Sequence, residues 1–169
     1  MNTIMKSGLQ IIVSVSVVLL LAGGVYSEQL ADRVVVDKSE SRLYLMHAGQ
    51  TFASYRVVFG ANPKGHKLQQ GDERTPEGQY LLDYKNANSL YYKSIHISYP
   101  NEFDRQEARK QGVDPGGDIM IHGQKNGYER LSFLAQRFNW TNGCIALSNK
   151  DMDSVWEAVQ PGTPIEIKP

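Results

Sequence analysis

Two stretches of the chain decide its fold: Ile119-Met120-Ile121-His122-Gly123 and Trp140-Thr141-Asn142-Gly143-Cys144-Ile145-Ala146-Leu147. Both contain short apolar runs, which are typical of buried strands. The first run ends in a histidine, and the second follows the only cysteine among the 169 residues. If the two strands are neighbours, we expect folding to bring the His122 imidazole within hydrogen-bonding reach of the Cys144 sulfur.

This pairing predicts a cysteine nucleophile. A thiol reacts poorly until it becomes a thiolate, and a nearby histidine can accept its proton. Gly143 directly precedes the cysteine and leaves room for backbone N–H groups to converge on the oxyanion of an acyl-transfer intermediate. Chemistry alone leaves a second interpretation open, because an unpaired cysteine is often a small, inert residue of the core.

The segments around these stretches predict a mostly β domain with a few short helices. Strands are expected at residues 33–37, 42–47, 51–59, 79–83, 94–98, 118–122, 144–147 and 164–167. Short polar turns join the first three strands, so these should form an antiparallel meander. Asn101 can cap a helix over residues 102–111, and Ser148 with Asp151 can cap a second helix that ends before Pro161.

Residues 1–27 differ from the rest of the chain. Lys6 is the only charged side chain before Glu28, and an apolar run from Leu9 to Ala22 is followed by small residues up to Ser27. This pattern indicates a signal peptide, and its length also fits an N-terminal membrane anchor. We therefore expect export to the periplasm or cell envelope, with residues 28–169 forming one domain that contacts a membrane only if the N-terminal segment is not cleaved.

The composition narrows the function classes. The formal net charge is zero and no block of like charges stands out, so nothing indicates nucleic-acid binding, which needs a basic surface. A single cysteine argues against a structural zinc site, and the four histidines do not have metal-ligand spacing. We expect a monomer that uses no metal and no organic cofactor.

Taken together, the motifs resemble the catalytic domain of the L,D-transpeptidases, the YkuD family. Members have a histidine followed by Gly or Ser and then a Ser/Thr-His-Gly-Cys motif, which His122-Gly123 and Thr141-Asn142-Gly143-Cys144 resemble. Arg74-Thr75-Pro76-Glu77-Gly78 is similar to the family's Thr-Pro-Glu-Gly turn. The resemblance covers about residues 33–167, and it implies a β-sandwich or barrel-like sheet with short helices.

The resemblance also implies a role for each residue of the motifs. Cys144 would be the nucleophile and His122 its general base, with the Gly123 carbonyl orienting the imidazole. The backbone amides of Asn142, Gly143 and Cys144 would form the oxyanion hole. Thr141 would support the loop, and we place it with Trp140 and Tyr128 as the residues that contact substrate. A second interpretation is open for the two aromatic side chains, which is that they only pack the loop. Residues 124–140, which separate the motifs, would form an enlarged lid or substrate-binding loop.

Three functions are then open. In the first, Cys144 takes an acyl group from a peptidoglycan tetrapeptide stem as a thioester and passes it to an amine of another stem. In the second, water resolves the thioester, which makes the protein a carboxypeptidase, an endopeptidase or a lipoprotein-releasing hydrolase. The third is an inactive wall-binding module. It is favoured by Asn142, where the family usually has a second histidine, and by Ala146, where many members have Arg or Asn.

Overall fold

The computed structural model describes residues 29–128 and 132–169. The expected signal peptide or anchor, residues 1–27, lies outside this part of the chain. Among the described residues, no helix combines the length and the apolar character that a membrane crossing requires.

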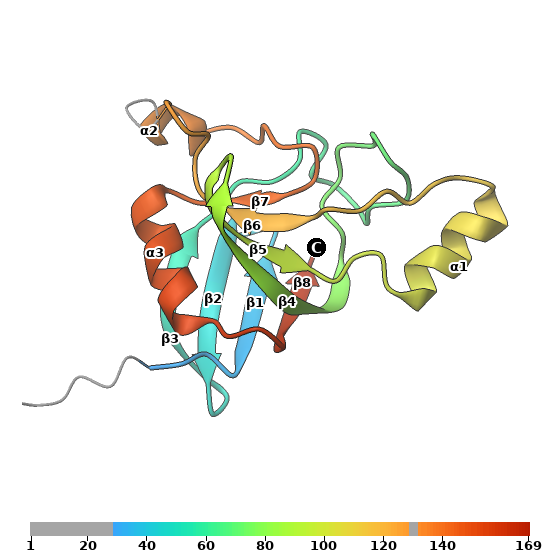
Figure 1. The fold of residues 1–169 in the computed structure, drawn as a ribbon. Helices are drawn as coiled ribbons and strands as arrows, with labels where there is room; N and C mark the ends of the chain where they lie inside the picture. Colours follow the sequence, from blue (N-terminus) through green and yellow to red (C-terminus); the bar gives the residue numbers. More distant parts are fainter. Residues whose placement is uncertain (1–28, 129–131) are drawn as a thin grey trace, which may run out of the picture.

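The strands of the described chain form one eight-stranded sheet in the order β3-β2-β1-β8-β4-β5-β6-β7 (Figure 1). In chain order they are β1 (Arg33–Asp37), β2 (Arg42–His47), β3 (Gln50–Arg56), β4 (Gly78–Ser89), β5 (Tyr92–Ile97), β6 (Met120–His122), β7 (Ile145–Ala146) and β8 (Thr163–Lys168). The helices are α1 (Glu102–Gln111), α2 (Ser132–Ala135) and α3 (Asn149–Ala158). The prediction of a mostly β fold with short helices is confirmed.

The pairing of the strands is partly as predicted. β1 and β2 are antiparallel, and so are β2 and β3, which confirms the meander. Two other pairs, β1 with β8 and β6 with β7, are parallel. The sequence did not predict them, because local patterns do not reveal which distant segments pair. The strand predicted at 79–83 is also longer, since β4 continues to Ser89 and forms a long hairpin with β5.

The sheet curls until its two edges meet. The predicted strand over residues 51–59 divides: β3 ends at Arg56, and Val58 exchanges backbone hydrogen bonds of 3.0 and 2.9 Å with Ala146 of β7. One step further along, Gly60 bridges to Thr141. The loop that carries Cys144 therefore lies where the sheet closes on itself, held by chain from both edges.

Side chains from the sheet and from α3 make one apolar core. Met152 and Val155 of α3 are fully buried, and burying such side chains stabilises the fold by about 1.5–3 kcal/mol each. They pack with strand residues that are also buried, among them Val34, Val36, Leu43, Leu45, Ile95, Ile97, Ile121, Ile145, Ile165 and Ile167. β6, β7 and the start of α3 are thus anchored in the core.

Helix α1 begins and ends as the sequence predicts. The Asn101 side chain accepts the Asp104 N–H at 3.1 Å, and the Asp104 carboxylate accepts the Asn101 N–H at 2.9 Å. These two bonds form a capping box. Gly112 ends the helix in a left-handed conformation. Figure 1 shows α1 projecting to one side of the sheet, away from β6 and β7.

Candidate active site

Strands β6 and β7 place the two candidate catalytic side chains on one face of the sheet. Their parallel register pairs Ile121 with Ile145 and His122 with Ala146. Because side chains alternate along a strand, His122 and Cys144 share the face opposite to these two core isoleucines. His122 ends β6 and Cys144 directly precedes β7, so the two residues are offset by two positions along the sheet. In ideal strand geometry this offset separates their Cα atoms by about 8 Å.

The His122 ring is held in one tautomer. Nδ1 lies 2.7 Å from the carbonyl oxygen of Gly123, and only a protonated nitrogen can donate to a carbonyl, so Nδ1 carries the hydrogen and Nε2 keeps its lone pair. The ring contacts Tyr91 and Trp140, with centroid distances of 4.7 and 5.8 Å, and these two rings also contact each other at 6.1 Å. The imidazole is therefore oriented as a base, and its contact with Gly123 is the one that the resemblance implies.

The Cys144 thiol faces the backbone of the strand beside it. Its sulfur accepts the Met120 N–H at 3.4 Å and lies 3.6 Å from the Asp118 carbonyl oxygen, to which the thiol donates. Within the described chain, these are the hydrogen bonds of the sulfur, and His122 is not among its partners. The predicted direct contact between imidazole and thiol is absent from this conformation, because the thiol is turned toward Asp118. Catalytic hydrogen bonds commonly tighten only when substrate is bound.

Both groups are uncharged at neutral pH. Burial raises the pKa of the Cys144 thiol above its ordinary 9.0; the Met120 N–H lowers it, and the charge of Asp118 raises it further. Burial also lowers the pKa of His122 below 6.5, although the bond to Gly123 acts in the opposite direction. The site therefore rests as a thiol and a neutral imidazole, so a nucleophilic attack by this sulfur would require the thiol to give up its proton.

This charge state predicts how the thiol reacts with pH. Alkylation by iodoacetamide follows the thiolate fraction, so Cys144 should react more slowly at pH 7 than a cysteine in an unstructured peptide. Since its pKa is raised, the rate should keep rising as the pH passes 9. Intact-protein mass spectrometry over a pH series measures this rate on the only thiol of the chain. A plateau reached below pH 8 would instead indicate a preformed thiolate.

Thr141 organises the loop before the cysteine. Its buried hydroxyl donates to the Cys144 carbonyl at 2.7 Å and accepts the Gly143 N–H at 3.1 Å. The assignment of the Gly143 amide to the oxyanion hole is therefore wrong for this structure, because that N–H is directed into the loop. The amides of Asn142 and Cys144 donate to no described residue, so they are the donors left to face an oxyanion.

The two candidate catalytic residues line one cavity of about 520 Å³. Trp140, Thr141 and Asn142 also line it, whereas Tyr128 does not. The Tyr128 ring lies outside, 56% exposed, with the Lys125 ammonium 5.6 Å from its centroid. The prediction that Tyr128 contacts substrate is thus not supported by its position.

A wall of the cavity was missed in the sequence. It is the tip of the β4–β5 hairpin, which contributes Asn86, Asn88, Ser89, Leu90 and Tyr91. Leu90 and Tyr91 are two large side chains between polar residues, a pattern that can indicate a binding surface. The sequence did not show that β4 extends to Ser89, so it did not place these two residues near Cys144. Leu90 is 78% exposed, as expected for a side chain at the rim of a binding cleft.

The site does not resemble a metal centre. Among residues 29–128 and 132–169, no three His, Cys, Asp or Glu side chains come together as metal ligands would. The other histidines have separate partners: His47 bonds to the Leu30 carbonyl, His66 to Asp104 and His96 to Asp83. Among the described residues that line the cavity, Asp118 is the one with a charged side chain.

The match to known proteins agrees with this geometry. The model of the YkuD family, described as the L,D-transpeptidase catalytic domain, matches residues 31–167. The chain belongs to the YkuD family.

Two known proteins are similar to this chain in sequence or in structure. YafK from Escherichia coli (strain K12), a provisionally named L,D-transpeptidase, is 30% identical over 129 residues, which cover 71% of this chain and 45% of YafK. The crystal structure of Pgp2 from Campylobacter jejuni, a helical cell shape determining protein, superposes with a TM-score of 0.61 at 28% identity, covering 80% of this chain and 46% of Pgp2. The chain thus spans about half the length of the relatives it matches.

The fold extends to more distant proteins. Bd1075 from Bdellovibrio bacteriovorus shares it with a TM-score of 0.56 at 23% identity, over 82% of this chain and 48% of Bd1075.

Two positions of this YkuD domain depart from the usual motif. Asn142 is exposed at the cavity wall, where it also borders a second hollow of about 370 Å³. Ala146 is fully buried and bonded through its backbone to Val58. Backbone donation from residue 142 does not depend on its side chain, so the first change leaves the candidate oxyanion donor in place.

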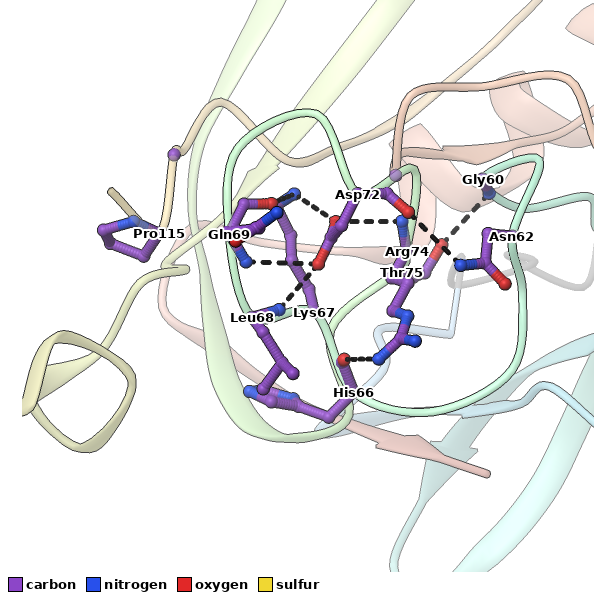
Figure 2. A network of polar contacts seen from close by, with 12 residues as sticks. Gly60, Asn62, His66, Lys67, Leu68, Gln69, Asp72, Arg74, Thr75 and Pro115 are labelled. Carbon is purple, nitrogen blue, oxygen red and sulfur yellow. Dashed lines mark hydrogen bonds and ion pairs between the residues drawn. The ribbon is translucent and has the colours of Figure 1, made fainter. Parts of the chain in front are cut away.

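A network of polar contacts holds the loop over residues 60–75 (Figure 2), and the Arg74 carbonyl of this loop lies close to Gly143. At its centre the Asp72 carboxylate accepts the backbone N–H groups of Leu68, Gln69 and Arg74 at 2.7 to 3.1 Å. It also accepts the buried Lys67 ammonium at 2.9 Å. A Thr75 hydroxyl accepts the Gly60 N–H at 3.2 Å. Asp72 thus fixes the path of the loop whose Arg74 carbonyl lies against Gly143.

Replacing Asp72 by alanine should destabilise the domain by about 2–3 kcal/mol, because three amides lose their acceptor and the buried Lys67 ammonium loses its counter-charge and keeps only the Gln69 carbonyl. Urea unfolding measures this change in the free energy of unfolding. Asp72→Asn is the matched variant, since it keeps the shape and one acceptor oxygen and should lose less. Neutral surface changes scatter by roughly 0.5 kcal/mol, so an alanine variant within about that margin of the wild type would contradict this role for Asp72.

Proposed function

We propose that this YkuD domain is a peptidoglycan L,D-transpeptidase that transfers an acyl group through a thioester on Cys144. The observation that carries the proposal is the shared cavity of Cys144 and His122, in which the imidazole presents a free Nε2 on the same sheet face as the thiol. Membership of the family supports the class of substrate, a peptide stem of the cell wall.

In the first half-reaction, the Cys144 thiol leaves Asp118 and gives its proton to Nε2 of His122 as the sulfur attacks a stem carbonyl. The carbonyl is that of diaminopimelate in its bond to the terminal D-alanine. The amides of Asn142 and Cys144 donate to the oxyanion as it forms. The His122 imidazolium then protonates the leaving nitrogen, the C–N bond breaks, and free D-alanine departs from a thioester.

In the second half-reaction, the amine of another stem attacks the thioester carbonyl. His122 accepts a proton from this amine, the C–S bond breaks, and the thiolate takes the proton back from the imidazolium. The product is an amide between the third residues of two stems. Because His122 must be neutral when each half-reaction starts, kcat/KM should fall as the pH drops through its lowered pKa, with an inflection below 6.5.

Incubation of the protein with purified disaccharide-tetrapeptide muropeptides tests the proposal. A transpeptidase releases D-alanine and forms dimers crosslinked between third residues, which mass spectrometry identifies. Monomers shortened by one residue, without dimers, would mean that water is the acceptor and would replace the proposal with a hydrolase. Binding to peptidoglycan sacculi without any product would indicate an inactive wall-binding module.

We also propose that residues 1–27 direct the chain out of the cytoplasm, so that the domain meets its substrate in the periplasm. This rests on the charge and apolar pattern of that segment. N-terminal sequencing of the protein recovered from a periplasmic extract checks it. A mature chain that begins near Glu28 is expected after cleavage, whereas an intact Met1 in a membrane fraction would indicate an anchor.

A further inference from the structure

The peptide bond between Gly123 and Gln124 is held at both of its ends. Its carbonyl oxygen accepts Nδ1–H of His122 at 2.7 Å. Its N–H, on the Gln124 side, donates to Oδ1 of Asn149 at 2.7 Å. In a trans peptide the C=O and N–H point in opposite directions within one plane. A side chain that fixes the N–H therefore also fixes the direction of the carbonyl that orients His122.

Asn149 supplies a hydrogen-bond acceptor just beyond the point where the backbone hydrogen bonds between β6 and β7 end. The Leu147 N–H still donates to the His122 carbonyl at 2.9 Å, one step past the end of β7. The chain then turns into α3, so its backbone no longer runs beside Gly123 and Gln124. The Gln124 side chain bonds back to the Leu147 carbonyl at 2.6 Å, and Asn149 supplies the next acceptor from its side chain.

The approach of Asn149 depends on the glycine beside the histidine. A Cβ atom at position 123 would lie 2.6 Å from Oδ1 of Asn149 and 2.9 Å from Cβ of Tyr92. Both distances are too short for a carbon atom, so Gly123 is the residue that permits this packing. The Gly123 N–H is bonded on its other side to the carbonyls of Tyr91 and Lys93, at 3.1 and 3.2 Å.

Helix capping does not account for Asn149. The cap of α3 is Ser148, whose hydroxyl accepts the Asp151 N–H at 3.1 Å. Asn149 is the first residue inside the helix, and its side-chain oxygen accepts the N–H of Gln124, which lies outside the helix. Its bond connects α3, which is anchored in the core through Met152 and Val155, to the peptide behind the imidazole.

We propose that Asn149 is a positioning residue, which acts through the Gly123–Gln124 peptide to hold the His122 ring in the tautomer and direction that a base for Cys144 needs. This inference rests on the proposed function for its consequence in catalysis, but the hold on the ring is a property of the folded protein alone. Loss of the Asn149 acceptor frees the peptide to rotate, which weakens the Gly123 contact and lets the ring populate its other tautomer.

The test is ¹⁵N NMR of the His122 ring in the full chain, which reports both tautomer and pKa. Wild-type protein should show the Nδ1–H form. Asn149→Ala should add the Nε2–H form and lower the pKa of His122 further, because the Gly123 bond favours the protonated ring. Asn149→Leu, which keeps the size but has no acceptor, should behave like alanine. Asn149→Asp retains an acceptor oxygen and should keep the wild-type tautomer, and Lys150→Ala, at the exposed next position, is the neutral control.

In muropeptide assays, the alanine and leucine variants should lose roughly 10- to 100-fold in kcat with little change in KM, as expected when a catalytic group is misplaced. A folded Asn149→Ala or Asn149→Leu protein with the wild-type tautomer and pKa would overturn the inference. So would an Asn149→Asp protein that loses the tautomer, even if the other two variants do not fold. A wild type without activity but with these ring shifts would reject only the proposed function, because the NMR readout does not depend on turnover.

Discussion

Replacing Cys144 by alanine is expected to reduce transpeptidation by at least about 1000-fold, to the rate of a reaction without protein. Without sulfur no thioester can form, and the remaining oxyanion donors have no intermediate to stabilise. The measurement is dimer formation and D-alanine release from muropeptides, followed over hours. Because the thiol makes two weak hydrogen bonds to the described residues, at 3.4 and 3.6 Å, and no others among them, the alanine variant should melt within a few degrees of the wild type.

The same variant provides a control for covalent chemistry. A carbapenem acylates an activated thiol, so wild-type protein should gain the mass of one carbapenem and the alanine variant should gain none. Serine at position 144 keeps a hydroxyl and should also fail, since an alcohol is a much weaker nucleophile than a thiol beside a neutral histidine. Turnover that survives in the alanine variant would remove Cys144 from the mechanism and leave the family's chemistry without its nucleophile here.

Local signals in the sequence predicted the elements well where the physical cause is local. The capping box at Asn101 and Asp104 and the left-handed Gly112 define α1 by contacts within a few residues. The alternation of Val34, Val36, Leu43 and Leu45 defines the first hairpin in the same way, because each side chain faces the core. Such elements need no knowledge of distant residues.

The details of the site depend on contacts that the sequence does not display. The family resemblance implies that the Gly143 N–H belongs to the oxyanion hole, but the Thr141 hydroxyl two residues earlier accepts it. The direction of the thiol is set by the Asp118 carbonyl, which lies 26 residues away in the chain. The hydrogen bond from the Gln124 N–H to the Asn149 side chain likewise joins residues 25 positions apart in the chain. Each of these contacts follows from how β6, β7 and the start of α3 are placed together.

Motif resemblance predicted the family but not the limits of the cleft. Trp140 lies at the cavity wall as expected, while Tyr128, from the same predicted loop, lies outside. The difference follows from distance to the sheet, since Trp140 directly precedes the residue that bridges to Gly60. The opposite wall comes from the extension of β4 past Asp83, where the sequence is polar and lacks the apolar alternation that marks a buried strand.

Replacing Gly143 by alanine is expected to have the second largest effect. Gly143 has a φ of +124°, which L-residues with a side chain rarely adopt. An added Cβ would lie 2.6 Å from the Arg74 carbonyl oxygen, and this backbone atom is fixed by the loop around Asp72. Strain of the backbone and the steric overlap together should cost about 3–5 kcal/mol of stability. The cysteine loop must shift to relieve them, which should lower kcat by roughly 100-fold or more.

Gly162 offers a matched control for the backbone part of this effect. Its φ of +93° is also left-handed, yet an added Cβ would have no atom within 4 Å. Gly162→Ala should therefore cost about 1–2 kcal/mol in urea unfolding, from backbone strain alone, and keep the wild-type kcat. The difference between the two variants isolates the contact between Gly143 and the Arg74 carbonyl. If both lose the same stability and neither loses turnover at a temperature where they are folded, the loop over residues 60–75 does not position Cys144.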